Sequence, residues 1–283
     1  MTDLRNDLKQ PRNVAGLVRD HNKIGASSRF PRSGVVLRQR SWLRVLAGPL
    51  NLDLRWASAR LDRLGSPESY ISALIRDDCD AAAGLPELVA LAAEIARQAV
   101  DQPLNLLTER DAPAWMYSWP GQHYKLLAAA VAVRQPKTVI EIGTFRGASA
   151  LALLENLPAD GRVMTFDVLP WAGIAQTLLR EDDPRSGRLI PVTADLSQPQ
   201  VFERHADVLR DADLLFIDGP KDGIFEYTIL SQLQACGLKK GTLLIFDDIR
   251  LWNMLGFWRE LELPKLDLTG FGHFTGTGLA QWA

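Results

Sequence analysis

The stretch Thr138-Val-Ile-Glu-Ile-Gly-Thr-Phe-Arg-Gly-Ala-Ser149 has the pattern of a buried strand, a tight turn and the start of a helix. Gly143 permits a sharp turn at the carboxyl end of the strand, and Gly147, which has no Cβ, lets the following helix approach closely. Open α/β sheets bind ligands at the carboxyl ends of their strands. The stretch therefore predicts a ligand site at a sheet edge, where helix-start amides and the Ser149 hydroxyl suit a carboxylate.

The spacing of the two glycines narrows the class of ligand. They stand as Gly-x-x-x-Gly, with Glu141 at the end of the strand. A dinucleotide-binding turn carries Gly-x-Gly-x-x-Gly and leaves its backbone open to a pyrophosphate. A carboxylate at Glu141 repels a pyrophosphate but accepts a hydrogen bond from the amino group of an amino acid. The spacing therefore argues against a nicotinamide dehydrogenase; glycines that serve packing alone are the other interpretation.

Short apolar runs alternate with helical patterns along most of the chain. The expected strands are 138–142, 162–167, 188–193, 214–218 and 242–246, followed by an antiparallel hairpin of 266–268 and 277–282. The expected helices are 66–80, one from Pro86, 121–134, 149–157, 171–180, 200–210 and 225–236. This alternation predicts an α/β fold: a doubly wound, Rossmann-like, mostly parallel seven-stranded sheet with helices on both faces.

The chain divides into three segments of different character. Residues 1–33 are polar, basic and interrupted by Pro and Gly, which predicts a flexible tail. Residues 34–110 are expected to form a helical extension or cap, and residues 111–283 the ligand-binding domain. The amphipathic part, 35–64, is expected to cover that domain; a peripheral membrane helix and a homodimer contact are the alternatives.

Composition excludes several other classes of protein. The formal net charge of −2 gives no reason to expect nucleic-acid binding, although residues 1–50 carry ten Lys or Arg against three Asp. Cys79 and Cys236 match neither a disulfide framework nor a zinc spacing, which predicts reduced thiols. Neither a secretory signal pattern nor an apolar run long enough to span a membrane occurs. We therefore expect a cytoplasmic protein without a transmembrane segment.

An acidic residue follows each of the next two strands. Asp167 lies 20 residues past Gly147, where a carboxylate bonds both ribose hydroxyls of a nucleotide. Asp195 follows the third strand, where a helix cap is the alternative role. With the Glu-x-Gly-x-x-x-Gly turn, these acids resemble those of class I methyltransferases, whose cofactor S-adenosylmethionine combines an amino acid with a nucleoside. The implied cofactor contacts are Glu141, Gly143, Thr144, Phe145, Gly147, Ser149, Asp167, Asp195 (at the adenine amino group) and Gln122.

Charged residues also gather at the ends of the fourth and fifth strands. Asp218 ends the fourth strand, with Lys221 three residues later, and Asp247 and Asp248 end the fifth. Parallel strands bring these ends to one edge, and three carboxylates with room for water suit Mg²⁺, or Mn²⁺ in its place. Without a cation the carboxylates repel one another, and at least one is expected to bind a proton.

This second pattern resembles the cation-dependent O-methyltransferases of the catechol O-methyltransferase type. That family carries Asp-x-x-Lys after the fourth strand and Asp-Asn after the fifth, and the resemblance covers roughly residues 121–281. It implies that Asp218, Asp247 and Asp248 are metal ligands. It also implies that Lys221, with Asp218, is catalytic, Lys221 being the base or electrostatic partner of the acceptor hydroxyl. The sequence departs from the pattern of this family at two places. Asp248 stands where the family has Asn, and Gly219-Pro220 stands where the family has an aromatic residue against the adenine.

The predicted function is methylation of a hydroxyl on a small molecule or sugar-containing metabolite, with S-adenosylmethionine as donor and Mg²⁺ as cofactor. The cation lowers the pKa of the hydroxyl and fixes it facing the methyl group. Lys221 takes the proton if burial and its neighbours depress its own pKa. The alternatives are a metal-independent O- or N-methyltransferase in which Asp248 is the base, and a module that binds S-adenosylmethionine without transferring its methyl group.

Two histidines and four tryptophans lie near the expected strand ends. We expect His123 to be a surface or capping residue and His273 to serve a turn. Four tryptophans are expected either to form an aromatic wall for the acceptor or to pack in the core. These are Trp115, Trp119, Trp252 and Trp258.

Overall fold

The computed structural model describes residues 84–113, 116 and 122–283. The predictions for the tail, for the amphipathic stretch, for the helix at 66–80 and for Trp115 and Trp119 lie outside these residues. None of the described helices is long and apolar enough to cross a membrane. The cytoplasmic location and the homodimer stay predictions.

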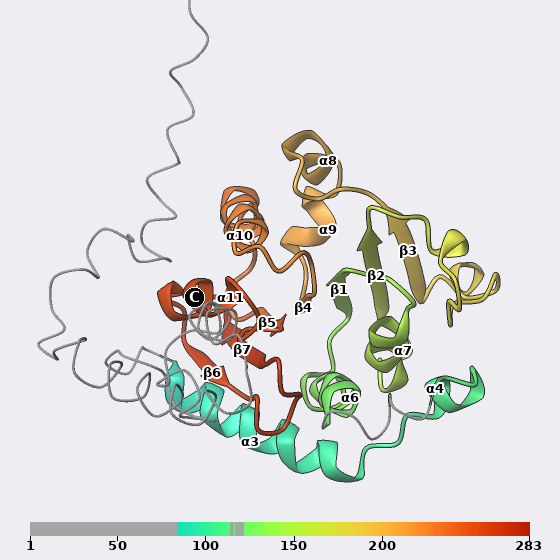
Figure 1. The fold of residues 1–283 in the computed structure, drawn as a ribbon, viewed down its shortest axis with the longest axis horizontal. Helices are drawn as coiled ribbons and strands as arrows, with labels where there is room; N and C mark the ends of the chain where they lie inside the picture. Colours follow the sequence, from blue (N-terminus) through green and yellow to red (C-terminus); the bar gives the residue numbers. More distant parts are fainter. Residues whose placement is uncertain (1–83, 114–115, 117–121) are drawn as a thin grey trace, which may run out of the picture. The chain divides into compact units, whose positions relative to one another are not determined.

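The described residues contain a seven-stranded sheet in the order β3-β2-β1-β4-β5-β7-β6 (Figure 1). The parallel strands are β1 (Thr138–Ile142), β2 (Arg162–Asp167), β3 (Leu189–Thr193), β4 (Leu214–Ile217) and β5 (Leu243–Asp247). The antiparallel strands are β7 (Thr277–Gln281), which pairs with β5, and β6 (Lys265–Asp267), which pairs with β7. The predicted doubly wound sheet with its antiparallel hairpin is therefore confirmed.

Helices cover both faces of this sheet, as Figure 1 shows. One face carries α3 (Leu85–Asp101), α4 (Asn105–Glu109), α6 (His123–Arg134) and α7 (Ala148–Glu155). The other carries α8 (Pro199–Arg204), α9 (Ala206–Arg210), α10 (Phe225–Cys236) and α11 (Met254–Glu260). Because each face has its own apolar core, the central strands β1, β4 and β5 are buried along their whole length.

The segment 171–180, expected to be a helix, is mostly irregular. Only a single 3₁₀ turn, η5 (Trp171–Gly173), forms there, directly after Pro170. The remainder runs along the glycine turn, where Leu178 N–H donates to the Arg146 carbonyl at 2.8 Å. Leu179 is buried against Gly147. Tertiary packing on the turn therefore overrides the helical pattern of this segment.

The helix expected at 200–210 is divided in two. α8 ends at Arg204 and α9 begins at Ala206, with His205 between them at φ −114. The His205 ring packs edge-on against Phe166 at the end of β2, with 5.1 Å between ring centroids. The break coincides with this anchoring contact to the sheet.

The carboxyl ends of the parallel strands share one edge of the sheet. Ile142 pairs with Ile217, so that the residues after β1 and β4 are neighbours, and Asp218 N–H donates to the Ile142 carbonyl at 2.8 Å. Ile217 in turn pairs with Phe246 of β5. Residues that follow different strands, and lie far apart in the sequence, are thereby brought together.

Candidate cofactor and metal site

Gly143 and Gly147 both adopt backbone conformations that favour glycine, with φ of 109 and 83. A Cβ on Gly143 would lie 2.1 Å from the Asp218 carbonyl oxygen, so this glycine allows the ends of β1 and β4 to approach. A Cβ on Gly147 would lie 2.5 Å from Cγ of Leu179. The two glycines therefore shape the turn through conformation and through packing.

Glu141 lies completely buried beneath this turn. One carboxylate oxygen accepts a hydrogen bond from the Thr165 hydroxyl, whose oxygen lies 2.5 Å from Oγ1 of buried Thr144. The other, Oε1, is outside hydrogen-bonding geometry with any described donor. Burial raises the pKa of Glu141 to about 7, and the Ser149 and Thr165 hydroxyls offset part of that effect. Glu141 thus keeps one buried oxygen available to a further donor.

Asp167 is held at the end of β2 by two backbone amides. Its Oδ2 accepts from Phe145 N–H at 2.8 Å, and its Oδ1 from Leu169 N–H at 2.9 Å. Phe145 itself has φ of 40 and a 62% exposed side chain. Because a carboxylate oxygen has a second lone pair, both oxygens of this oriented acid can still accept from a ligand hydroxyl.

The two remaining predicted cofactor contacts make other bonds. Asp195 Oδ1 accepts from the Ser197 amide at 3.0 Å and from the Ser197 hydroxyl at 2.6 Å. The Ser197 hydroxyl lowers the pKa of Asp195. These bonds form a local turn and not the helix cap considered for Asp195, because Gln198 stands at the N-cap of α8 and that helix has no side-chain cap bond. Gln122 N–H donates to the Phe271 carbonyl at 2.9 Å, while its side-chain oxygen is buried without a described partner. Contact of either residue with a cofactor stays a prediction.

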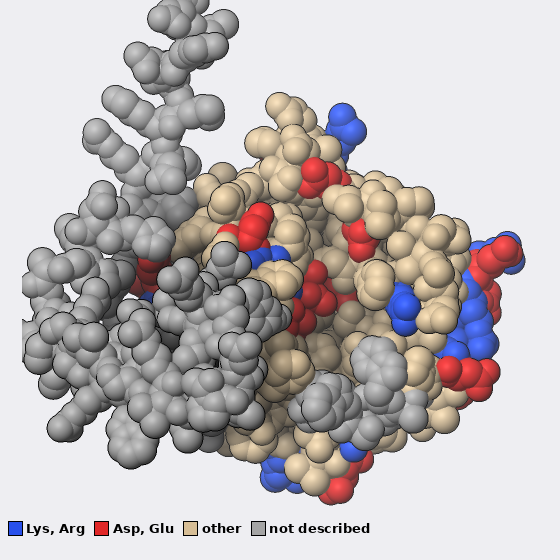
Figure 2. All heavy atoms as spheres, in the orientation of Figure 1, with Lys and Arg blue, Asp and Glu red and all other residues tan. Residues whose placement is uncertain are grey.

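Asp218, Asp247 and Asp248 come together as expected. Each offers one carboxylate oxygen, and these oxygens lie within 4.8 Å of one another. Figure 2 shows acidic atoms in a hollow near the middle of the described face, over β1 and β4. Asp248 has φ of 58, a left-handed conformation that Asp and Asn adopt more readily than most residues. The carboxylate cluster has the composition of a site for a hard divalent cation.

Lys221 lies within this cluster. Its Nζ donates to Asp218 Oδ1 at 2.8 Å and lies 3.7 Å from Asp248 Oδ2. Burial alone lowers the pKa of Lys221, but the carboxylates of Asp218, Asp247 and Asp248 more than offset it, so the pKa is raised. The condition set for Lys221 to act as a base, a depressed pKa, is therefore not met, because the neighbouring carboxylates are anionic. In the same cluster, burial and Asp247 raise the pKa of Asp218 well above its usual value, consistent with the expected bound proton.

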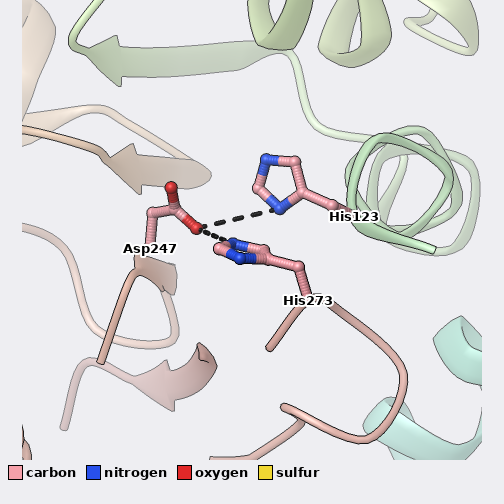
Figure 3. Close-up of side chains that lie close together, drawn as sticks. All are labelled: His123, Asp247 and His273. Carbon is pink, nitrogen blue, oxygen red and sulfur yellow. Dashed lines mark hydrogen bonds and ion pairs between the residues drawn. The ribbon is translucent and has the colours of Figure 1, made fainter. Parts of the chain in front are cut away.

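His123 and His273 lie together beside Asp247 (Figure 3). The surface role expected for His123 is wrong, because its side chain is mostly buried. His273 does begin a turn, since its carbonyl accepts from Gly276 N–H at 2.9 Å, but its side chain also reaches Asp247. His273 Nε2 is 2.5 Å from Asp247 Oδ1, and His123 Nδ1 is 3.8 Å from the same oxygen. The side chains are only 11% and 10% exposed. They belong to different elements, since His123 begins α6 and His273 lies between β6 and β7. No sequence spacing joins them to Asp247, so only the fold reveals this group.

The electrostatics of the histidines and Asp247 are linked. Burial lowers the pKa of His123 to about 4, despite the opposing effect of Asp247. Burial also lowers that of His273, but its bond to Asp247 raises it by more. The pKa of Asp247 is lowered, because His123, His273 and Lys221 more than offset burial.

The described tryptophans separate into one core and one surface residue. Trp258 is 3% exposed and packs against Phe246, with 6.1 Å between ring centroids. Trp252 is 67% exposed. Of these two, only Trp252 is free to contact an acceptor.

Comparisons with known proteins identify the family. The O-methyltransferase family profile matches residues 104–261. Catechol O-methyltransferase from Niastella koreensis is 30% identical over 203 residues, covering 62% of this chain and 86% of that protein. Catechol O-methyltransferase from Mus musculus is 32% identical over 130 residues, covering 44% of this chain and 47% of that protein, about half its length. A solved O-methyltransferase from Bacillus cereus in complex with SAH is 20% identical, with a TM-score of 0.42, covering 73% of this chain and 94% of that one.

The chain belongs to the O-methyltransferase family. The prediction of a class I, S-adenosylmethionine-dependent methyltransferase of the catechol O-methyltransferase type is confirmed at this level. The nicotinamide dehydrogenase considered from the sequence is set aside. The roles of individual site residues, the cation and the acceptor stay predictions.

Proposed function

We propose that this protein transfers a methyl group from S-adenosylmethionine to a hydroxyl oxygen of a small molecule, with Mg²⁺ held by Asp218, Asp247 and Asp248. The observation that carries the proposal is the convergence of these carboxylates, within 4.8 Å, at the sheet edge that also carries the glycine turn. Membership of the O-methyltransferase family supports the reaction class.

The turn from Glu141 to Gly147 is the proposed place of S-adenosylmethionine. Glu141 Oε1, buried and without a described partner, suits the ligand's ammonium group. Asp167, held by two backbone amides, suits the ribose hydroxyls. When bound, the cofactor supplies a methyl group on a positively charged sulfur. The chain's own contribution is to orient that group toward the carboxylate cluster.

The carboxylate cluster fits a magnesium ion with little rearrangement. Ligands of Mg²⁺ lie about 2.0–2.1 Å from the ion, so two ligands of one ion are at most about 4.2 Å apart. A cluster within 4.8 Å has to close only slightly. When bound, the cation lowers the pKa of an acceptor hydroxyl and holds it in place.

Lys221 is proposed as the electrostatic partner of the acceptor oxygen. Its raised pKa keeps the ammonium form, and its bond to Asp218 fixes its position. A fixed ammonium group stabilises the negative charge that develops on the oxygen as its proton leaves. Of the two roles expected from the sequence, this one agrees with the charges around Lys221.

A metal-independent methyltransferase is the second candidate. Lys221 Nζ lies 2.8 Å from Asp218 Oδ1 and 3.7 Å from Asp248 Oδ2, so the cluster contains one positive charge of its own. Burial and Asp247 raise the pKa of Asp248, which makes this carboxylate a better base. In this version Asp248 accepts the proton of the acceptor hydroxyl.

The relatives suggest which acceptors to test first. They include proteins named catechol O-methyltransferase and caffeoyl-CoA O-methyltransferase. We therefore propose an acceptor with an aromatic hydroxyl and take catechol and caffeoyl-CoA as the first probes. Exposed Trp252 offers an aromatic surface for such a ring.

Transfer of labelled methyl from S-adenosylmethionine to these acceptors, with Mg²⁺ or with chelator, separates the two candidates. We expect transfer that chelator abolishes and Mg²⁺ restores. Asp218→Asn removes one ligand and is expected to lower kcat/KM by roughly 100-fold or more. Asp207→Asn, the same change on an exposed acid of α9, is the matched control and is expected to leave transfer unchanged.

Transfer that persists in chelator contradicts the cation and favours the metal-independent candidate. Asp248→Asn then tests the base: it abolishes transfer if Asp248 accepts the proton, and transfer that survives the change contradicts that role.

A further inference from the structure

His123, Asp247 and His273 place three metal-binding side chains from three separate elements around one point (Figure 3). One nitrogen or oxygen from each lies within 4.8 Å of the others. We propose that these residues form a second cation site, which takes a nitrogen-preferring divalent transition metal such as Zn²⁺. The inference does not require methyl transfer; it shares only Asp247 with the proposed function.

The first support is an unsatisfied nitrogen. Nδ1 of His123 is buried, and no described residue is in hydrogen-bonding geometry with it. A buried polar atom without a partner is unfavourable by about 1–3 kcal/mol, and an ion or water that completes its bonding is the usual explanation. In Figure 3 this nitrogen faces the carboxylate of Asp247, 3.8 Å away. A cation between the two groups satisfies both.

The second support is the orientation of His273. Its Nδ1 lies 2.5 Å from the Thr275 hydroxyl, while its Nε2 points to Asp247. Metal-binding histidines commonly donate the N–H of one ring nitrogen to a nearby oxygen, which leaves the lone pair of the other for the ion. The Thr275 hydroxyl accepts from Nδ1–H in that state. The His273 ring is therefore already held by a neighbour of the required kind.

The distances fit an ion of this size after a small movement. Zinc lies about 2.0–2.1 Å from nitrogen and oxygen ligands, so ligand atoms around one ion are about 3–4 Å apart. The 3.8 Å between His123 Nδ1 and Asp247 Oδ1 falls in this range. The 2.5 Å between His273 Nε2 and the same oxygen has to lengthen by about 1 Å. The two rings meet edge to face, with centroids 4.6 Å apart.

The donor atoms define which cation is preferred. Mg²⁺ prefers oxygen ligands, and the neighbouring acidic cluster supplies three of them. Two imidazoles and one carboxylate instead suit Zn²⁺, Co²⁺ or Cu²⁺. Three protein ligands also leave a fourth position for water or for an oxygen of the acceptor. The edge of the sheet thus offers two sites of different preference, with Asp247 common to both.

A titration with Co²⁺, a spectroscopic substitute for Zn²⁺, tests this site on the full chain stripped of metal. The Asp218→Asn background weakens the acidic site and isolates the proposed one. We expect visible absorption bands that saturate at about one equivalent of Co²⁺, that Zn²⁺ abolishes and that excess Mg²⁺ leaves intact. His123→Ala and His273→Ala are each expected to weaken Co²⁺ binding by roughly 100-fold.

His205→Ala is the matched control. His205 is the remaining histidine of the described residues, lies beside Phe166 and is outside the cluster, so its loss is expected to leave Co²⁺ binding unchanged. Binding of S-adenosylhomocysteine and the thermal unfolding of each variant report whether it folds. Electron paramagnetic resonance of bound Cu²⁺ in the wild type counts coordinated nitrogens without any variant, and we expect two.

Three results overturn the inference: no Co²⁺ binding, Co²⁺ binding that neither histidine variant weakens, or a Cu²⁺ spectrum without nitrogen coupling. The group is then an ordinary hydrogen-bonded histidine–aspartate pair with a nearby second histidine. Failure of the proposed function is seen separately. If Mg²⁺ and methyl transfer fail while two nitrogens still bind Cu²⁺, the second site stands alone.

Discussion

Glu226, in the first turn of α10, is 1% exposed, and neither of its oxygens is in hydrogen-bonding geometry with a described donor. Burial raises its pKa from 4.5 to about 7, and the nearby amides of Glu226 and Gly223 offset only part of this. The folded state therefore holds this proton more tightly than the unfolded state does. The stabilising effect is complete below pH 4.5 and is lost as the pH rises through about 7.

Glu226→Gln is expected to remove this pH dependence. At about pH 8 the variant should be more stable than the wild type by about 3 kcal/mol, and near pH 4.5 the two should be nearly equal. Urea unfolding at both pH values measures the difference in free energy. Glu203→Gln, a change at an exposed position of α8, is the control and should shift neither value. Equal stabilities of Glu226→Gln and the wild type at pH 8 would show that ionisation of the buried Glu226 does not destabilise the folded state.

At the same scale, the acids were predictable and the histidines were not. Asp218, Asp247 and Asp248 each lie at or directly after the carboxyl end of a strand, and the rule that parallel strands end at one edge places them together. His123 precedes β1 on a helix, and His273 lies in the hairpin connection. No rule of strand order fixes where such segments place their side chains. The pKa of Lys221 also depends on contacts within about 4 Å, which a sequence does not supply.

At the scale of elements, the junction between β1 and α7 combines a left-handed glycine conformation with tight packing. Gly147 has φ of 83, and a Cβ there would lie 2.5 Å from Cγ of Leu179. Gly241, before β5, has nearly the same φ, 82, with no atom within 4 Å of an added Cβ. The two glycines therefore have the same backbone conformation, but only Gly147 lacks room for a Cβ.

Gly241→Ala is therefore expected to be less stable than the wild type by about 1–2 kcal/mol, from conformation alone. Gly147→Ala adds an overlap with Leu179, so we expect a further loss of about 1–3 kcal/mol. Urea unfolding of both variants measures the two values. If the losses are equal, Leu179 does not constrain the turn.

The sequence pattern predicted the parallel strands accurately but predicted the segment 171–180 wrongly. The five parallel strands begin and end within one residue of their expected positions, because continuous apolar runs between turns have few other solutions. The segment 171–180 contains enough apolar residues for a helix, yet Leu178 and Leu179 are bound to the glycine turn instead. Whether this segment forms a helix depends on a tertiary contact, and the spacing of apolar residues in the sequence carries no information about that contact.

At the scale of the whole molecule, the strand order explains why one edge carries all the predicted chemistry. β1 lies between β2 and β4, and β5 adjoins β4, so the cofactor turn and the carboxylate cluster are neighbours. The alternation of strands and helices was sufficient to predict a parallel sheet whose strands end at one edge, but not the order of the strands. The acceptor was not predictable, since its surroundings depend on connections such as the one around Trp252, where no motif identifies a ligand.

Calorimetric titration of the full chain with S-adenosylhomocysteine tests the central claim most directly, because it needs neither the acceptor nor the cation. We expect one site per chain with a dissociation constant of about 1 μM, equivalent to about −8 kcal/mol. Gly143→Ala should abolish the binding, since its Cβ would lie 2.1 Å from the Asp218 carbonyl oxygen, whereas Gly241→Ala should bind as the wild type does. A folded wild-type chain that shows no binding at about 1 mM ligand would contradict the assignment of the Glu141–Gly147 turn as a cofactor site.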